Sequence, residues 1–169
     1  MRRSGRCPPA ASTGKALALV LAALLTACTR RSPRIAVGVL DAGLGAFLDV
    51  HPLSSGQPVR VDEVARTASA SYHLVQARSS ERPHRHVTHD LTVVVLRGSG
   101  ILRMGALRRR LAAGDTALVP RDTVHWFASD GADPAVALVI FTPPLDGPDN
   151  VPVDPAAEEP RIDSLSGDG

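Results

Sequence analysis

Two stretches of the chain, PHRHVTHDLTVVVLRGSG at residues 83–100 and GDTALVPRDTVHWF at residues 114–127, decide the fold and the candidate site. In an extended strand, side chains two residues apart project from the same face, so His84 and His86 present two imidazoles to one point. His125 arrives from a different strand, well after them along the chain. Imidazole nitrogens at about 2.1 Å are ligands that a divalent metal ion accepts. The two stretches therefore predict a metal site built on β-strands.

The surrounding chain consists of short apolar segments separated by turn residues such as Gly98-Ser99-Gly100 and Ala113-Gly114-Asp115. The segments expected to be strands are 59–65, 70–78, 91–97, 100–104, 107–112, 116–119, 124–128 and 135–142. Many strands with hairpin spacing and little helix predict an all-β protein, either an antiparallel sandwich or a closed barrel.

Together the two stretches resemble the paired motifs of the cupin superfamily. The first family motif has two His separated by one residue, then a short turn, then usually a Glu, and then a strand that ends in Gly. Residues 83–100 match it except at the Glu. The second motif has a Gly, a Pro and a following His, matched by Gly114, Pro120 and His125. The resemblance covers about residues 58–145. It implies a double-stranded β-helix, the cupin or jelly-roll barrel, preceded here by a short N-terminal helix or irregular segment.

The resemblance also implies a metal ion near the barrel mouth, bound by His84, His86 and His125. The divalent ion is Fe, Mn, Zn, Ni or Cu, and the sequence does not choose among them. Each imidazole must be neutral to coordinate, so metal affinity is expected to fall as the pH drops through about 6.5, the ordinary pKa of His.

One departure from the family motif concerns the fourth ligand. The usual Glu aligns with Leu91, which cannot coordinate a metal. Asp90 or His89 is a possible replacement, and otherwise water or substrate completes the shell. Strand alternation places Leu91, Val93 and Val95 toward the interior, which points Asp90 outward unless the preceding turn carries a bulge.

Three residues are weaker candidates for a substrate pocket. Val93 and Val95 face the predicted interior, and His73 alternates with Val75 and Ala77 on the strand before the first motif. A plain strand residue remains the alternative for His73.

The N-terminal segment has the features of an export signal. Residues 1–27 contain basic residues, an apolar run too short to span a bilayer, and then Leu25-Thr26-Ala27 before Cys28. This tetrapeptide resembles the lipobox of bacterial lipoproteins. The resemblance implies removal of residues 1–27, a lipid anchor on Cys28 with fatty-acyl chains such as palmitate, and a lipidated tether at 28–34. Thr29 is not the Asp that retains some lipoproteins in the inner membrane, so the periplasmic face of the outer membrane is expected in a double-membraned host.

The rest of the chain is divided into three regions. Residues 35–57 are expected to cover the barrel, with a short helix that begins near Asp41 and ends before Pro52. Residues 58–146 form the barrel, and residues 147–169 form an acidic, Pro-rich tail that is mostly disordered, in particular beyond Pro152. Because the strand at 91–97 is apolar on both faces, the 35–50 segment or a second subunit in a homodimer must cover its outer face.

Composition excludes some partners. Five aromatic residues in 169 are too few for a base-stacking surface, and removal of residues 1–27 leaves 15 basic and 17 acidic residues, so no nucleic-acid partner is expected. Two functions remain. The first is a metalloenzyme that acts on a small molecule by oxygenase- or isomerase-type chemistry. The second is a non-catalytic module that binds or senses a small molecule without requiring a metal, because the fold alone does not decide activity.

Overall fold

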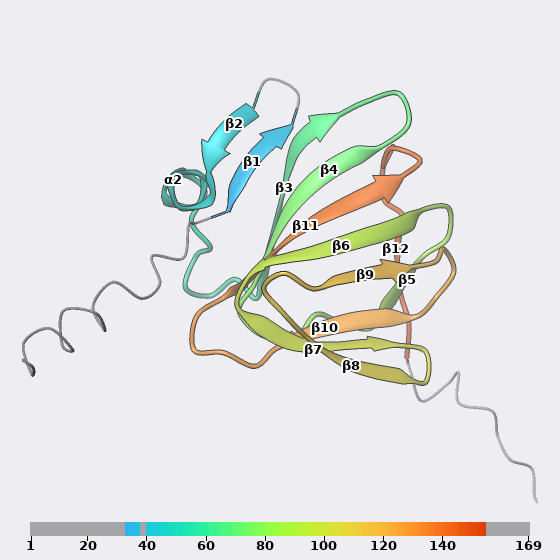
Figure 1. Cartoon of the computed structure of the whole chain (residues 1–169). Coiled ribbons are helices and arrows are strands. Elements are labelled where there is room, and N and C mark those ends of the chain that lie inside the picture. The colour runs from blue at the N-terminus through green and yellow to red at the C-terminus, as the bar shows by residue number, and fades with distance from the viewer. Residues whose placement is uncertain (1–32, 38–39, 155–169) are drawn as a thin grey trace, which may run out of the picture. The chain divides into compact units, whose positions relative to one another are not determined.

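The structure is a computed structural model that describes residues 33–37 and 40–154. Two five-stranded antiparallel sheets form the barrel, accompanied by a two-stranded hairpin and one short helix (Figure 1). This architecture confirms the predicted all-β double-stranded β-helix with a short N-terminal helix. The predicted signal peptide, the lipidation site Cys28 and residues 155–169 lie outside the described residues.

The elements follow one another along the chain without long gaps. Their bounds are β1 Arg34–Val37, β2 Leu40–Gly43, α2 Leu44–Val50, β3 Val59–Arg66, β4 Ser71–Ala77, β5 His84–His86, β6 Asp90–Arg97, β7 Ser99–Met104, β8 Leu107–Ala112, β9 Thr116–Val119, β10 His125–Ser129, β11 Ala135–Thr142 and β12 Asn150–Pro152. All eight predicted strands are present, with ends that differ by one residue at most.

The first sheet has the strand order β3-β4-β11-β6-β9. Its register places Val139 of β11 opposite Val93 of β6 and Phe141 opposite Leu91. Side chains at alternate positions share a face, so these residues and Val95 lie on the inner side of the sheet, as predicted from the strand pattern.

The second sheet has the order β12-β5-β10-β7-β8 and closes the barrel. Leu102 of β7 and Leu111 of β8 are buried against Leu91, Val95 and other residues of the first sheet in one hydrophobic cluster. The apolar core therefore lies between the two sheets and supports the strands that carry the histidines.

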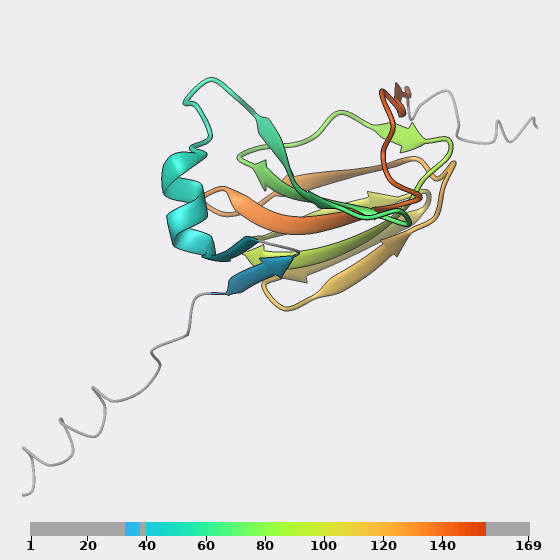
Figure 2. The ribbon, with the colours of Figure 1, turned by 90° about the horizontal axis from the view of Figure 1, so that it is seen from above.

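Helix α2 covers part of the outer face of the first sheet. Its residues Leu44, Phe47 and Leu48 are buried together with Leu74 of β4, and Leu96 of β6 packs against this cluster. Figure 2 shows α2 and the β1–β2 hairpin at the same end of the barrel. Helix α2 thus provides an intramolecular cover for β6 at Leu96. Among the residues that the structure describes, no helix has both the length and the hydrophobicity needed to cross a bilayer.

The predicted cover segment differs from the structure in its details. The helix begins at Leu44 rather than near Asp41, because Asp41 pairs with Ala36 in the β1–β2 hairpin. Gly43 precedes the helix in an extended conformation and makes no side-chain cap. Local pairing of the hairpin thus overrides the capping preference of an Asp.

The first residues of the acidic tail are ordered up to Pro152, the residue beyond which disorder is expected. Residues Asn150–Pro152 form β12, which pairs with β5 so that Asn150 lies opposite His86 and Pro152 opposite His84. The amide of Val153 donates to the carbonyl of Pro83 at 3.0 Å. The ordered chain therefore extends to the histidine strand, because backbone pairing to β5 compensates for the polar, Pro-rich composition.

Candidate metal centre

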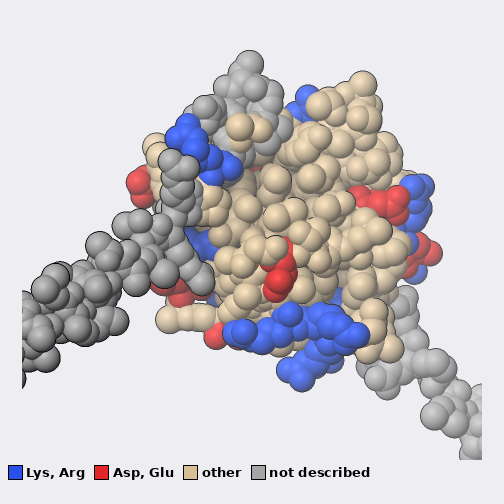
Figure 3. Space-filling view, in the orientation of Figure 1, with Lys and Arg blue, Asp and Glu red and all other residues tan. Residues whose placement is uncertain are grey.

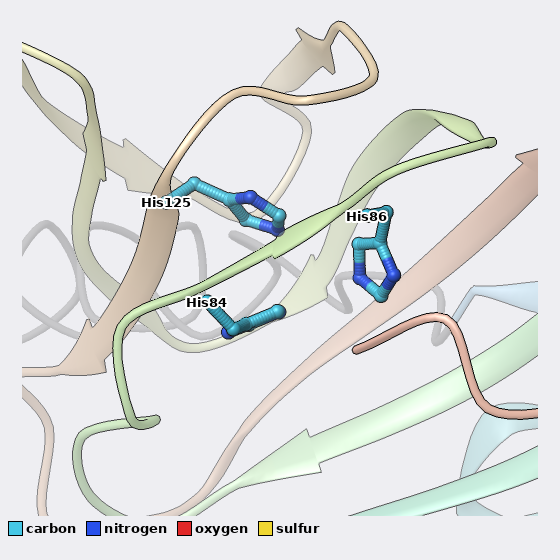
Figure 4. A group of neighbouring side chains, drawn as sticks. All are labelled: His84, His86 and His125. Atoms are coloured by element: carbon cyan, nitrogen blue, oxygen red, sulfur yellow. The ribbon is translucent and has the colours of Figure 1, made fainter. Parts of the chain in front are cut away.

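Three histidines from two neighbouring strands lie together. His84 and His86 belong to β5, and His125 begins β10 directly opposite His84 in the antiparallel pairing. The ring centroids of His84 and His125 are 4.4 Å apart, and those of His86 and His125 are 5.5 Å apart. Figure 4 shows the three rings gathered at one place between the strands. One nitrogen from each ring lies within 4.8 Å of the other two, so the set is close enough to bind a single ion.

Backbone carbonyls fix the orientation of two of these rings. His84 Nδ1 lies 2.8 Å from the carbonyl oxygen of Arg82, and His125 Nδ1 lies 2.9 Å from that of Thr123. A carbonyl only accepts, so each Nδ1 carries the proton and donates it. The neutral ring then has its lone pair on Nε2, which is the arrangement found in metal-ligating histidines.

The third ring, His86, is positioned by an aromatic contact. Its edge meets the Phe141 ring of β11, with centroids 5.1 Å apart and planes at 88°. His86 Nδ1 is buried and has no hydrogen-bond partner. This nitrogen lies 3.8 Å from an oxygen of the Asp149 carboxylate. Three imidazoles that each offer a nitrogen within 4.8 Å of the other two fit a divalent ion.

Burial keeps two of the rings neutral. Burial lowers the pKa of His86 to about 4, with a further lowering by His84 and a partial offset by Asp149. Burial likewise lowers the pKa of His125 to about 4, although its hydrogen bond to Thr123 acts in the opposite direction. A metal ligand must be neutral, so these two rings are ready to coordinate well below pH 6.5, the value expected from sequence.

Nuclear magnetic resonance of the metal-free protein tests this electrostatic account. We expect the rings of His86 and His125 to titrate with midpoints near pH 4. In the unfolded chain both titrate near pH 6.5, so the unfolded state binds more protons between pH 6.5 and 4, and the free energy of unfolding falls as the pH drops through this window. Midpoints at or above 6.5 for both rings would show that they are solvated rather than buried.

The two candidates for a fourth ligand lie outside this group of three. The Asp90 carboxylate accepts hydrogen bonds from the side chain and backbone of Arg121, and this pairing lowers the pKa of Asp90. Both ring nitrogens of His89 have partners, because Nδ1 contacts Asp149 and Nε2 lies 3.2 Å from the carbonyl oxygen of Pro144. Neither side chain has a free ligand atom directed at the histidine group.

A cavity of about 140 Å³ adjoins the three histidines. Val93 and Val95, two of the predicted pocket residues, line it, as do His84, His86 and His125. His73, the third predicted pocket residue, does not line it. The reason is local: His73 is buried beside Phe141, with ring centroids 4.9 Å apart, and its Nε2 lies 2.9 Å from Ser71 Oγ.

Sequence reasoning missed a carboxyl group at this cavity, that of Glu81. Its side chain lines the cavity and accepts a hydrogen bond from the Phe127 amide of β10 at 2.9 Å, and its own amide donates to the Phe127 carbonyl. Burial raises the pKa of Glu81, while the Phe127 hydrogen bond and His84 act in the opposite direction. Residues 78–83 have no strand periodicity from which the position of Glu81 could be predicted. The only indication in the sequence is that Glu81 lies three residues before His84.

Sequence reasoning also missed the contacts that Asp149 makes beside the histidine strand. Its carboxylate accepts hydrogen bonds from the amides of Val87 at 3.1 Å and Thr88 at 3.3 Å, contacts His89 Nδ1, and lies 3.8 Å from His86 Nδ1. Asp149 therefore ties the segment before β12 to the turn that follows the two metal-site histidines. The side chain acts from beside the site, as a support for His86.

Comparison with known proteins places the chain among proteins of the same fold. A family model described as a cupin domain matches residues 71–141. An uncharacterized protein of Aquifex aeolicus (strain VF5) is 37% identical over 100 residues, which cover 59% of this chain and 82% of that protein.

Two solved structures have a fold similar to that of this chain. The structure of KdgF from Halomonas sp. has 26% sequence identity and a TM-score of 0.50, with 53% of this chain and 82% of that chain covered. A Klebsiella pneumoniae protein with a double-stranded β-helix domain has 20% identity and a TM-score of 0.54, with 62% and 93% covered. The matched region contains the strands that carry all three histidines.

Proposed function

The chain belongs to the cupin superfamily, and from this premise we propose that it binds one divalent metal ion through His84, His86 and His125 and acts on a small molecule in the adjoining cavity. The observation that carries the proposal is the convergence of three buried imidazole nitrogens within 4.8 Å of one another. A site of three neutral nitrogens suits Zn, Fe, Ni or Cu better than Mg or Ca, which prefer oxygen ligands.

The residues around the three histidines would have separate roles at such a site. When bound, the metal supplies Lewis-acid chemistry at an oxygen of the small molecule. The carbonyls of Arg82 and Thr123 hold the His84 and His125 rings in a fixed tautomer, and Phe141 packs against His86. Because only three ligands come from the protein, positions remain open for water or substrate.

Glu81 favours catalysis over simple binding. A carboxyl group whose pKa is raised by burial keeps its proton to higher pH than an exposed one, which suits a general acid or base. Glu81 lines the same cavity as the three histidines, so a molecule bound beside the metal site can reach this carboxyl group. Its hydrogen bond with the Phe127 amide also holds the segment in place, so its position in the cavity is what supports a role in proton transfer.

Metal content tests the proposal directly. Protein incubated with excess Zn²⁺ and then dialysed should retain one ion per chain. Retention near zero at pH 7.5, with the barrel folded, would contradict it.

We also propose that the protein is exported and attached to the membrane through a lipid on Cys28, on the periplasmic face of the outer membrane where the host has one. The sequence Leu25-Thr26-Ala27-Cys28 supports this proposal. Cys28→Ser should shift the protein from the detergent phase to the aqueous phase in a phase-partitioning experiment, because acyl chains contribute about 0.8 kcal/mol per buried CH₂. Cys7→Ser, which changes a residue that cleavage removes, is the matched control. Equal partitioning of both variants into detergent would overturn the anchor.

A further inference from the structure

The cavity beside the three histidines has an unusual distribution of polarity. Only five of its lining residues carry a polar side chain, namely Glu81, His84, His86, His125 and Asn150. All other lining side chains are aliphatic or phenylalanine. Among the described residues that form the wall there is no Lys or Arg, and the exposed arginines of β8 lie on the surface, in the blue band at the lower edge of Figure 3.

The five polar side chains share one wall. His84 and His86 lie on β5, His125 on β10 and Asn150 on β12, and these three strands are neighbours in the order β12-β5-β10. Glu81 joins them through its paired hydrogen bonds with the backbone of Phe127 on β10. The facing wall, from β4, β6 and β11, is apolar. The polar side chains are therefore gathered at one place in the cavity, and the rest of the lining, including Leu102, Leu111 and Phe127 of the second sheet, is apolar.

A lining with so few polar groups argues against a ligand that is polar all round. A sugar carries hydroxyl groups all round its ring, and each hydroxyl buried against β6 and β11 without a partner costs about 1–3 kcal/mol. Because the wall has no Lys or Arg, a charged group of the ligand could be held only at the metal ion.

The volume of the cavity also bears on which molecules it can hold. A cavity of about 150 Å³ lined by aliphatic and aromatic side chains accommodates benzene, and the volume here is about 140 Å³. A single six-membered ring, or a hydrocarbon chain of equal volume, therefore fits the cavity without rearrangement, and a larger molecule would extend out through its open side.

We propose that the cavity takes a molecule with a hydrocarbon body of about this size and one oxygen-bearing head, the class of a phenol or an enolisable ketone. The body lies against Val93, Val139 and their apolar neighbours, and the oxygen lies toward Glu81 and the histidines. This inference deepens the proposed function, because it names the substrate class of the same site.

Calorimetry with phenol as the probe tests the substrate class. Phenol should bind the Zn²⁺-treated protein with a dissociation constant of about 1 mM or tighter, a modest affinity suited to a ligand of few atoms. myo-Inositol, a ring of the same size with hydroxyl groups all round, should bind at least tenfold more weakly. Tighter binding of myo-inositol than of phenol would overturn the proposal.

Variants of two neighbouring residues on β6 test whether phenol binds in this cavity. Val93→Phe fills the cavity and should weaken phenol binding at least tenfold, whereas Val94→Phe, on the opposite face of the strand, should leave it within twofold. Should Val93→Phe fail to fold, Glu81→Gln serves, because it keeps the volume and should weaken phenol binding several-fold. Unchanged phenol binding in the folded variant would show that the probe binds elsewhere.

The same titrations separate this inference from the proposed metal function. Zinc content is measured on each sample, and phenol is also titrated into metal-free protein. Zinc retention without phenol binding overturns the substrate class and leaves the metal site intact. Phenol binding that is lost in Val93→Phe but occurs without zinc retention supports the substrate class and overturns the metal site.

Discussion

His125→Ala is expected to abolish stoichiometric metal binding while the barrel stays folded. The variant removes one of three ligand nitrogens that lie within 4.8 Å of one another. Loss of a residue that merely supports a ligand typically weakens metal binding 10–100-fold, so loss of the ligand itself should weaken it more than about 100-fold. Zinc content after dialysis at pH 7.5 measures the effect, and circular dichroism confirms the fold.

His51→Ala is the matched control for this experiment. His51 follows helix α2, stacks on Phe47 with ring centroids 4.2 Å apart, and contacts Asp62 at 3.4 Å. It lies outside the group of three histidines, so its removal deletes an imidazole without touching the candidate site. Full and equal zinc occupancy in both variants would show that the three histidines do not form the metal site.

Gly100→Ala is expected to lower the free energy of unfolding strongly. Gly100 is buried in β7, where a Cβ atom would lie 2.2 Å from Phe127 Cζ and 2.4 Å from the backbone oxygen of Ala128. The oxygen belongs to the paired strand β10, so the clash is relieved only by moving the strand that begins with His125. Overpacking of this kind typically costs about 1–3 kcal/mol, and the backbone contact places Gly100→Ala at the upper end.

Gly45→Ala provides the opposite control in a urea denaturation experiment. Gly45 is exposed within α2, and a Cβ atom added there would meet nothing within 4 Å. Alanine is favoured over glycine inside a helix by about 0.5–1 kcal/mol, so this variant should be slightly more stable than the wild type. Equal unfolding midpoints for the two variants would contradict the close approach of β7 and β10.

The sequence allowed the barrel and the three candidate ligands to be predicted because both depend on strand periodicity and motif spacing. Alternation along 91–97 placed Leu91, Val93 and Val95 inside, and the register with β11 and β9 agrees. The same rule put His84 and His86 on one face. Periodicity assigns a face but not a depth, which is why His73 faces inward yet is buried beside Phe141 and does not line the cavity.

Residues outside regular strands could not be predicted in this way. Glu81 reaches the cavity from an irregular segment, and its position depends on hydrogen bonds to Phe127, far away in the chain. Asp149 and β12 lie in a stretch whose composition favours disorder, and their place depends on pairing with β5. Long-range backbone pairing of this kind leaves no local pattern in the sequence.

X-ray absorption at the zinc edge of the zinc-loaded protein tests the central claim most directly. The arrangement of His84, His86 and His125 predicts three imidazole nitrogens around each ion, at about 2.0–2.1 Å. The remaining ligand should be an oxygen, from water or a bound small molecule, since no fourth protein ligand joins the group among the described residues. A spectrum with three imidazole ligands in the wild type, and no stoichiometric zinc signal in His125→Ala, is the result expected. A first shell of oxygen alone, or of sulfur at about 2.3 Å, would contradict the three-histidine site.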